Sequence, residues 1–175
     1  MAEADGFPEV QVPGSFELLY QRDYAAVVGL VYGLTGSRWV AEDLAQEAFL
    51  RAHRDWPRVE GMESPGGWVR RVALNLARSR WRRLRIETTA RLRADSGRQS
   101  AHIDPDPESE AFWDEVRRLP SRQAQAIALH YVEDLPVSEI ADVLGVADGT
   151  VKALLHQGRE RLQRQLTAKG ILDEV

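Results

Sequence analysis

The stretch VSEIADVLGVADGTVKALLHQGRERL, residues 137–162, contains the pattern of two short amphipathic helices. The apolar residues of the first helix recur at the spacing of one helix face: Val137, Ile140, Ala141 and Leu144. Gly145 breaks this pattern and supplies a turn conformation that residues with a Cβ resist, so a second helix is expected within about four residues. The apolar positions of the second helix are Val151, Leu155, Gly158 and Leu162. The pattern predicts a helix-turn-helix whose second helix lies in the major groove of DNA, although an ordinary helical hairpin uses the same spacing.

The composition limits the classes of protein to which the chain can belong. Its 175 residues suffice for one domain or two small ones, and the absence of cysteine excludes disulfides, thiolate zinc sites and a cysteine nucleophile. No apolar run approaches the length that crosses a bilayer, so we expect a cytoplasmic protein without membrane insertion. The formal net charge of -4 argues against a nucleic-acid binder that relies on bulk charge. The location of the arginines therefore becomes decisive.

A helix is predicted over residues 37–56, with Ser37 as its N-cap and an apolar side that faces the core. The opposite side presents Asp43, Gln46 and Leu50, with Glu47 towards its margin. A leucine among carboxylate and amide groups resembles the apolar centre and polar rim of a protein-docking patch. The pattern equally allows Leu50 to pack under a neighbouring helix while the acids are solvated.

The next predicted helix, WVRRVALNLARSRWRRLR, begins at Trp68 and contains seven arginines and no acidic residue. One of its faces is apolar, and the face nearly opposite presents Arg71, Asn75, Arg78 and Arg82. Arginines along a helix match the spacing of phosphates, and an asparagine amide can pair with a base edge. Trp68 and Trp81 are candidates for stacking on unpaired bases, but packing in the core is the favoured interpretation. This helix is therefore predicted to bind nucleic acid.

The fold class predicted from these patterns is all-α, with two small helical domains joined by a flexible linker. Residues 87–107 lose the apolar periodicity, and their prolines and acidic residues favour an extended linker. The N-terminal domain is assigned to residues 15–86 and the C-terminal domain to residues 108–168. Residues 1–14 are expected to be a disordered lead and residues 169–175 a tail.

Three motifs occur in a fixed order along the chain. They are AEDLAQEAFLRAHR, then WVRRVALNLARSRWRRL after a loop, and then LPSRQAQAIALHYVEDLPVSEIADVLGVADGTVKALLHQGRERL. Together they resemble the extracytoplasmic function (ECF) family of RNA polymerase sigma factors. The resemblance spans residues 16–166 and implies a sigma region 2 domain followed by a region 4 helix-turn-helix domain. It also implies that the protein binds core RNA polymerase and directs transcription from specific promoters.

The resemblance assigns roles to the residues at matching positions. The polymerase-binding residues would be Asp43, Gln46, Glu47 and Leu50, which in the family dock on the clamp helices of the largest subunit, and this decides between the two interpretations of Leu50. The residues that would recognise and melt the minus-ten promoter element are Trp68, Arg71, Asn75, Arg78 and Arg82. Those that would read the minus-thirty-five element are Gly149, Thr150, Lys152, His156 and Arg159. The flap of the second-largest subunit is a further implied partner, and family members are often held by an anti-sigma factor, which no residue here identifies.

The second helix of the helix-turn-helix departs from the family pattern. Members typically have basic residues at the positions of Leu154 and Gln157, which are neutral in this chain. Ala147 and Pro136 stand where capping serines are common. These differences predict weaker or altered recognition of the minus-thirty-five element, without an effect on the fold.

Two other functions fit the sequence less well. A stand-alone helix-turn-helix regulator would bind DNA as a dimer and has no use for the arginine helix that begins at Trp68. An enzyme is not expected, because no phosphate-cradling glycine loop is present and the histidines lack metal-ligand spacing. These histidines are His53, His102, His130 and His156. No cofactor or metal is expected.

Overall fold

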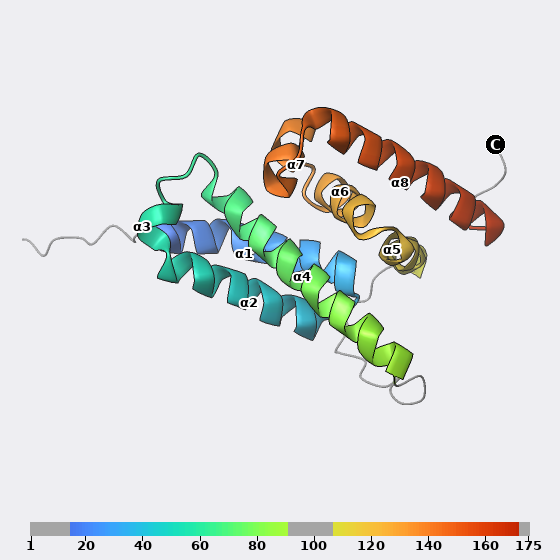
Figure 1. The fold of residues 1–175 in the computed structure, drawn as a ribbon, viewed down its shortest axis with the longest axis horizontal. Helices are drawn as coiled ribbons and strands as arrows, with labels where there is room; N and C mark the ends of the chain where they lie inside the picture. Colours follow the sequence, from blue (N-terminus) through green and yellow to red (C-terminus); the bar gives the residue numbers. More distant parts are fainter. Residues whose placement is uncertain (1–14, 91–106, 172–175) are drawn as a thin grey trace, which may run out of the picture.

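The computed structural model describes residues 15–90 and 107–171, with side chains placed for residues 16–80 and 109–171. All regular elements within these ranges are helices, so the predicted all-α class is confirmed. The helices are α1 (Ser15–Thr35), α2 (Arg38–Arg54), α3 (Trp56–Val59), α4 (Pro65–Ala90), α5 (Pro107–Arg118), α6 (Ser121–Val132), α7 (Val137–Leu144) and α8 (Asp148–Ala168). We call residues 15–90 the N-terminal half and residues 107–171 the C-terminal half. Figure 1 shows α1 to α4 grouped on one side of the molecule and α5 to α8 on the other.

The N-terminal half is built around a core between α1, α2 and α4. Ser37 is the N-cap of α2 as predicted, because its hydroxyl oxygen accepts a hydrogen bond from the backbone N–H of Val40 at 3.4 Å. The apolar faces of the three helices meet in one buried cluster that includes Val27, Val31, Ala45, Phe49, Val69 and Ala73. Most of the buried residues of α2 are alanines, which lets the helix axes approach closely. This packing leaves one long face of α2 and one of α4 outside the core.

Helix α4 begins at Pro65, before the predicted start at Trp68, and the short helix α3 occupies part of the predicted loop. Proline suits the first turn of a helix, where its missing N–H has no intrahelical partner to lose. The hydroxyl of Ser64 accepts a hydrogen bond from the N–H of Gly67 at 3.1 Å and so satisfies one of the free donors. The sequence analysis placed a loop before Trp68, whereas Pro65, Gly66 and Gly67 form the first helical turn.

The helix-turn-helix prediction is confirmed by α7 and α8. Gly145 follows α7 in the left-handed conformation, with a φ of 66°, which glycine adopts without strain. The N–H of Val146 then donates to the carbonyl of Ala141 at 3.1 Å. Gly158 lies where α8 packs on α6, and a Cβ there would come within 3.1 Å of Ile127. One glycine therefore permits the turn, and the other permits the close approach that fixes α8 on its support.

The two halves pack against each other, which the sequence did not predict. Helix α1 lies against α5 and α6, and α4 lies against α7. Leu30 of α1 and Leu74 of α4 are buried in the same cluster as Ile127 and Ile140 of the C-terminal half. One of the two apolar cores therefore contains residues from both halves.

Three predicted segments lie wholly or partly outside the described residues. The lead over residues 1–14 lies outside them, as does the end of the tail predicted over residues 169–175. The linker predicted over residues 87–107 is described only at its ends, where α4 continues to Ala90 and α5 begins at Pro107. Both helices thus extend into the segment predicted as linker.

A buried guanidinium connects the two halves. The side chain of Arg70 on α4 is 12% exposed and lies between Asp23 of α1 and Glu133, which follows α6. Its Nε donates to Glu133 at 2.7 Å, and its Nη1 lies 3.5 Å from Asp23. Burial alone would raise the pKa of Asp23, but hydrogen bonds and charges from Arg22 and Arg70 outweigh burial and hold this pKa below its ordinary value. Burial likewise opposes the charged form of Arg70, yet its two carboxylate partners raise its pKa.

Replacing Asp23 by asparagine is expected to lower the free energy of unfolding by about 2 kcal/mol near neutral pH, because Arg22 and Arg70 lose an ionised acceptor. The folded-state pKa of Asp23 lies below its ordinary value of 3.8. The ionised carboxylate of Asp23 therefore contributes its full stabilisation above about pH 3.8, and this stabilisation is lost as the pH falls through the lowered pKa. Urea unfolding of the wild type and Asp23→Asn across a pH series measures the difference. A difference that persists at the acid end of the series would mean that Asp23 acts through packing and not through charge.

Candidate nucleic-acid and protein interfaces

One long face of α8 is polar and exposed. It presents Gly149, Thr150, Lys152, His156 and Arg159, all of them exposed. A Cβ at Gly149 would meet nothing within 4 Å, so no side chain crowds the N-terminal end of this face. Helix α8 packs mainly on α5, α6 and α7, on the side of the C-terminal half remote from α2 (Figure 1). The face predicted to read duplex DNA is therefore open, as insertion of this helix into a major groove requires.

Arg159 is restrained at the end of this face by Tyr131 of α6. Its Nε donates to the Tyr131 hydroxyl at 3.2 Å, and its guanidinium carbon lies 5.8 Å from the centre of the ring. Tyr131 is 52% exposed, so it orients Arg159 without covering it. The sequence analysis did not identify Tyr131, because no local pattern indicates that the end of α6 lies beside α8.

The two neutral replacements on α8 have structural roles. Leu154 is partly buried and packs against the core of the C-terminal half. Gln157 accepts a hydrogen bond from Nε2 of Gln123 on α6 at 3.1 Å. Both side chains therefore fix α8 to the rest of the half, and α8 offers fewer cations to phosphates than the family pattern does.

The exposed face of α4 contains three of the predicted minus-ten residues, Arg71, Asn75 and Arg78. Trp68 is partly buried against the core of the N-terminal half, in agreement with the favoured packing interpretation. Trp81 and Arg82 lie outside the described side chains. The described part of this face therefore presents one amide and two guanidinium groups.

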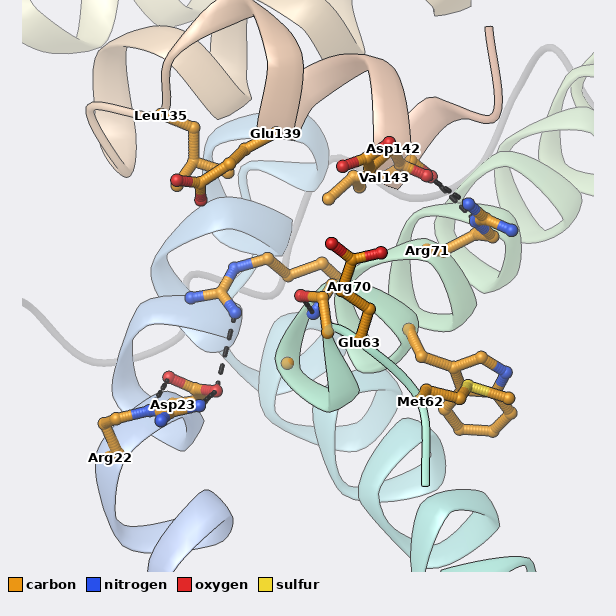
Figure 2. A pocket seen from close by; sticks show the side chains of 14 residues that line it. Arg22, Asp23, Met62, Glu63, Arg70, Arg71, Leu135, Glu139, Asp142 and Val143 are labelled. Carbon is orange, nitrogen blue, oxygen red and sulfur yellow. Dashed lines mark hydrogen bonds and ion pairs between the residues drawn. The ribbon is translucent and has the colours of Figure 1, made fainter. Parts of the chain in front are cut away.

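Arg71, on the same face, already has partners within the chain. It borders a cavity of about 640 Å³ between the two halves, whose walls combine arginines and carboxylates. Figure 2 shows Arg70 extending toward Asp23 and Arg71 directed at α7. Nε of Arg71 donates to the carbonyl of Val143 at 3.0 Å, and its Nη2 donates to the carbonyl of Asp142. The predicted minus-ten face is therefore partly occupied by the helix-turn-helix.

The predicted docking face of α2 is open to solvent. Asp43 and Gln46 are exposed, and Leu50 is 50% exposed. Glu47 is partly exposed, and its Oε1 accepts a hydrogen bond from Nε of Arg51 on the next turn at 2.8 Å. The interpretation in which Leu50 packs under a neighbouring helix is therefore wrong. An apolar side chain within a polar rim remains available to another protein.

The same face extends to Trp39, which the sequence analysis missed. Trp39 is 62% exposed, the largest value for a large hydrophobic residue in the described part of the chain. The guanidinium carbon of Arg80 on α4 lies 5.9 Å from its ring centre, and Nη1 of Arg80 lies 3.8 Å from the Asp43 carboxylate. Trp39 precedes Asp43 by one helical turn, and this spacing was the available signal.

Residues 15–90 and 107–171 contain neither a candidate metal site nor a membrane-spanning helix. No group of three or more His, Asp or Glu side chains there is arranged to hold a metal ion. None of the helices in these ranges has the length and apolar character needed to cross a membrane.

Comparison with known sequences gives the class of protein. Residues 19–86 match the family model of sigma-70 region 2, and residues 109–162 match that of sigma-70 region 4. The ECF RNA polymerase sigma factor SigW of Bacillus subtilis is 30% identical over 151 residues, which cover 78% of this chain and 81% of SigW. The RNA polymerase sigma-E factor of Streptomyces coelicolor is 26% identical over 131 residues, which cover 75% of this chain and 74% of that protein.

The two matched regions are those of sigma factors, a class of regulatory DNA-binding proteins that act in transcription and are not enzymes. The protein belongs to the ECF family of RNA polymerase sigma factors, which direct transcription initiation at promoters.

Solved structures agree on the fold. The sigma factor RpoE from Bartonella quintana, in complex with the anti-sigma factor NepR, has a TM-score of 0.72 at 20% identity and covers 91% of this chain and 99% of RpoE. CnrH, in complex with the cytosolic domain of CnrY, has a TM-score of 0.61 at 21% identity and covers 88% of each chain. Because the family models of region 2 and region 4 match both halves, a stand-alone helix-turn-helix regulator is not favoured.

Proposed function

We propose that the protein acts in initiation through three helix faces: that of α2 binds core RNA polymerase, that of α4 binds the minus-ten element, and that of α8 binds the minus-thirty-five element. The observation that carries this proposal is the exposure of three chemically different faces on one folded support. Sigma factors bind RNA polymerase, so core polymerase and promoter DNA are the required partners. Because both partners are cytoplasmic, we infer that the protein acts in the cytoplasm.

The α2 face fits a protein partner better than nucleic acid. The carboxylates of Asp43 and Glu47 repel phosphates but can pair with cations of another protein. Leu50 and Trp39 are exposed apolar side chains of the kind that become buried at the centre of an interface. Gln46 lies between them and offers an amide to the same partner. We infer that this partner is the pair of clamp helices on the largest polymerase subunit.

The α4 face fits DNA that has been opened. Arg78 supplies a cation for phosphate, and Asn75 is placed to donate to and accept from the edge of an exposed base. Arg71 lies on the same face and adds a second cation for phosphate, and the sequence pattern assigns Arg82 to it as well. Trp68 packs beneath the start of this face and supports it. We infer that this face recognises the minus-ten strand and helps to melt the duplex.

The α8 face fits duplex DNA. Lys152, His156 and Arg159 follow one another along the helix, while Gly149 and Thr150 lie in its first turn, where the positive end of the helix dipole favours a phosphate. We infer that the C-terminal half also contacts the flap of the second-largest polymerase subunit. The solved structure of the sigma factor RpoE is a complex with the anti-sigma factor NepR, which supports an anti-sigma factor as a further partner.

Replacing Leu50 by aspartate is expected to weaken binding to core polymerase at least about 30-fold, because an apolar anchor is replaced by a charge that the interface must bury. Replacing Trp39 by alanine is expected to weaken binding about tenfold. Titration of the labelled chain with purified core polymerase measures both affinities, and circular dichroism reports whether helicity is retained.

The matched control is Leu18→Asp, because Leu18 is a leucine of similar exposure, 53%, on α1. It introduces the same charge outside the α2 face and is expected to leave polymerase affinity unchanged. Equal affinities for Leu50→Asp and Leu18→Asp would contradict the assignment of the α2 face.

The two DNA-binding faces are expected to respond differently to substitution. Asn75→Ala should reduce open-complex formation about tenfold on a duplex promoter and should be partly rescued by a preformed minus-ten bubble, because the lost contact is to an exposed base. Lys152→Ala should show no rescue, and should reduce the slope of log affinity against log salt by about one, because one phosphate contact is lost. A base-unstacking fluorophore in the reconstituted holoenzyme measures opening on both templates.

The control for α4 is Ser79→Ala, a substitution at an exposed position of the same helix. The template is a promoter identified from the transcripts that the protein produces with core polymerase. If Asn75→Ala is equally defective on duplex and bubble templates, Asn75 has no role in melting.

A further inference from the structure

Over residues 148–158 of α8, the two sides of the exposed polar face differ in charge. Lys152 and His156 lie along one side. Helical spacing places Thr150 and Gln157 together on the other side, and both are exposed. This second side contains no cation over these turns, so it does not attract phosphates by charge. Its chemistry suits hydrogen bonds to the edge of a base.

A buried glutamine of α6 holds the amide of Gln157 in one orientation. Gln123 is 6% exposed, and its Nε2 donates to Oε1 of Gln157 at 3.1 Å. The Oε1 of Gln123 is buried and has no hydrogen-bond partner in the described part of the chain. The reverse pairing would supply this oxygen with a donor but would leave the buried NH2 group without an acceptor, which folded proteins tolerate less. Gln123 is therefore the donor of this pair.

The close packing of α8 on α6 brings the two glutamines together. A Cβ at Gly158, the residue after Gln157, would lie 3.7 Å from the Cβ of Gln123 and 3.1 Å from Ile127. Leu154, one turn before Gln157, packs against the core of the C-terminal half. The backbone on both sides of Gln157 is therefore fixed, and its hydrogen bond joins two packed helices.

This hydrogen bond determines which group of Gln157 is available to DNA. A free glutamine amide can pair with adenine, because it accepts from N6 and donates to N7. In this structure Oε1 is turned toward α6 by its bond to Gln123, whereas Nε2 has no acceptor among the described residues. Gln157 is exposed and therefore acts as a donor toward DNA. Guanine presents two acceptors in the major groove, O6 and N7, whereas cytosine presents a donor.

We propose that Gln157 is a specificity-determining residue that selects guanine at one position of the minus-thirty-five element, and that Gln123 is the positioning residue that keeps its amide from pairing with adenine. The inference rests on the proposed function of the α8 face. It assigns base selectivity to the side of that face that lacks cations, whereas the side with Lys152 and His156 supplies contacts to phosphate.

Base preference is measured with the full chain in reconstituted holoenzyme, on a promoter identified from the transcripts that it produces. Each of the four base pairs is placed in turn at every position of the minus-thirty-five element, and competition against the unchanged promoter gives the relative affinity. The wild type is expected to prefer guanine to adenine about tenfold at one position. Gln157→Met should remove this preference. Gln163→Met, at an exposed position of the same helix, is the matched control and should leave it unchanged.

Gln157→Glu tests the direction of the hydrogen bond to the base. The carboxylate has acceptors where the amide has its donor, and Gln123 can still donate to it. The preferred base at the same position is therefore expected to change from guanine to cytosine, whose N4 is a donor.

Gln123→Met tests the positioning role. Methionine is unbranched and fills the buried site without an N–H donor, so the amide of Gln157 becomes free to turn. The ratio of the affinities for guanine and adenine is expected to fall from about ten to about three or less, because a free amide pairs with either base. A loss of stability alone would lower both affinities together. Adding Gln123→Met to Gln157→Met should have no further effect on the ratio.

A preference for any base other than guanine at the position that depends on Gln157, or the absence of such a position, would overturn the role of Gln157. An unchanged ratio in Gln123→Met would overturn the role of Gln123. A wild-type chain that does not transcribe with core polymerase would instead contradict the proposed function.

Discussion

The arrangement of the molecule depends on one buried cation, the guanidinium of Arg70. Removing a guanidinium from water is costly unless carboxylates pair with it, and Arg70 lies between Asp23 and Glu133. The first pair fixes α4 against α1, and the second fixes it against the C-terminal half. Once Arg70 is turned inward, helical periodicity determines the rest of α4, with Val69, Ala73 and Leu74 buried and Asn75 and Arg78 in solvent. The same interaction therefore holds the halves together and orients the face that we assign to DNA.

The sequence predicted those elements whose signals are local. The turn of the helix-turn-helix could be predicted because Gly145 interrupts an apolar spacing that resumes a few residues later. The start of α4 was missed because proline and glycine favour both a loop and a first helical turn, and only the hydrogen bond to Ser64 distinguishes them. The packing of the halves was missed for a different reason. It depends on Gly33 and Leu74, which occupy ordinary positions in helical patterns and contact residues distant in the sequence.

Periodicity indicates which residues share a helix face, but not whether that face is covered. Leu50 and Arg71 illustrate this limit, because the same rule placed each of them opposite the apolar face of its helix. Both side chains are exposed, but Arg71 also donates to backbone carbonyls of α7. Trp39 shares the helical spacing of Asp43 and Leu50, but a tryptophan near a helix start is read as core until its exposure is known. Candidate residues on one face can thus be predicted from the sequence, while their availability depends on tertiary packing.

The location of charges explains how a chain with a formal net charge of -4 can bind DNA. Carboxylates neutralise many of the arginines within the chain: Arg70 has two acidic partners, and Arg117 has two more in Glu110 and Asp114. The cations that remain for DNA are few, since Lys152 and Arg159 are the described cations on the α8 face apart from the titratable His156. The electrostatic attraction to DNA grows with the number of phosphates that a protein neutralises. A small number of cation–phosphate contacts therefore gives weak binding by the chain alone. We therefore expect stable promoter binding to require the polymerase, which would add its own contacts to DNA.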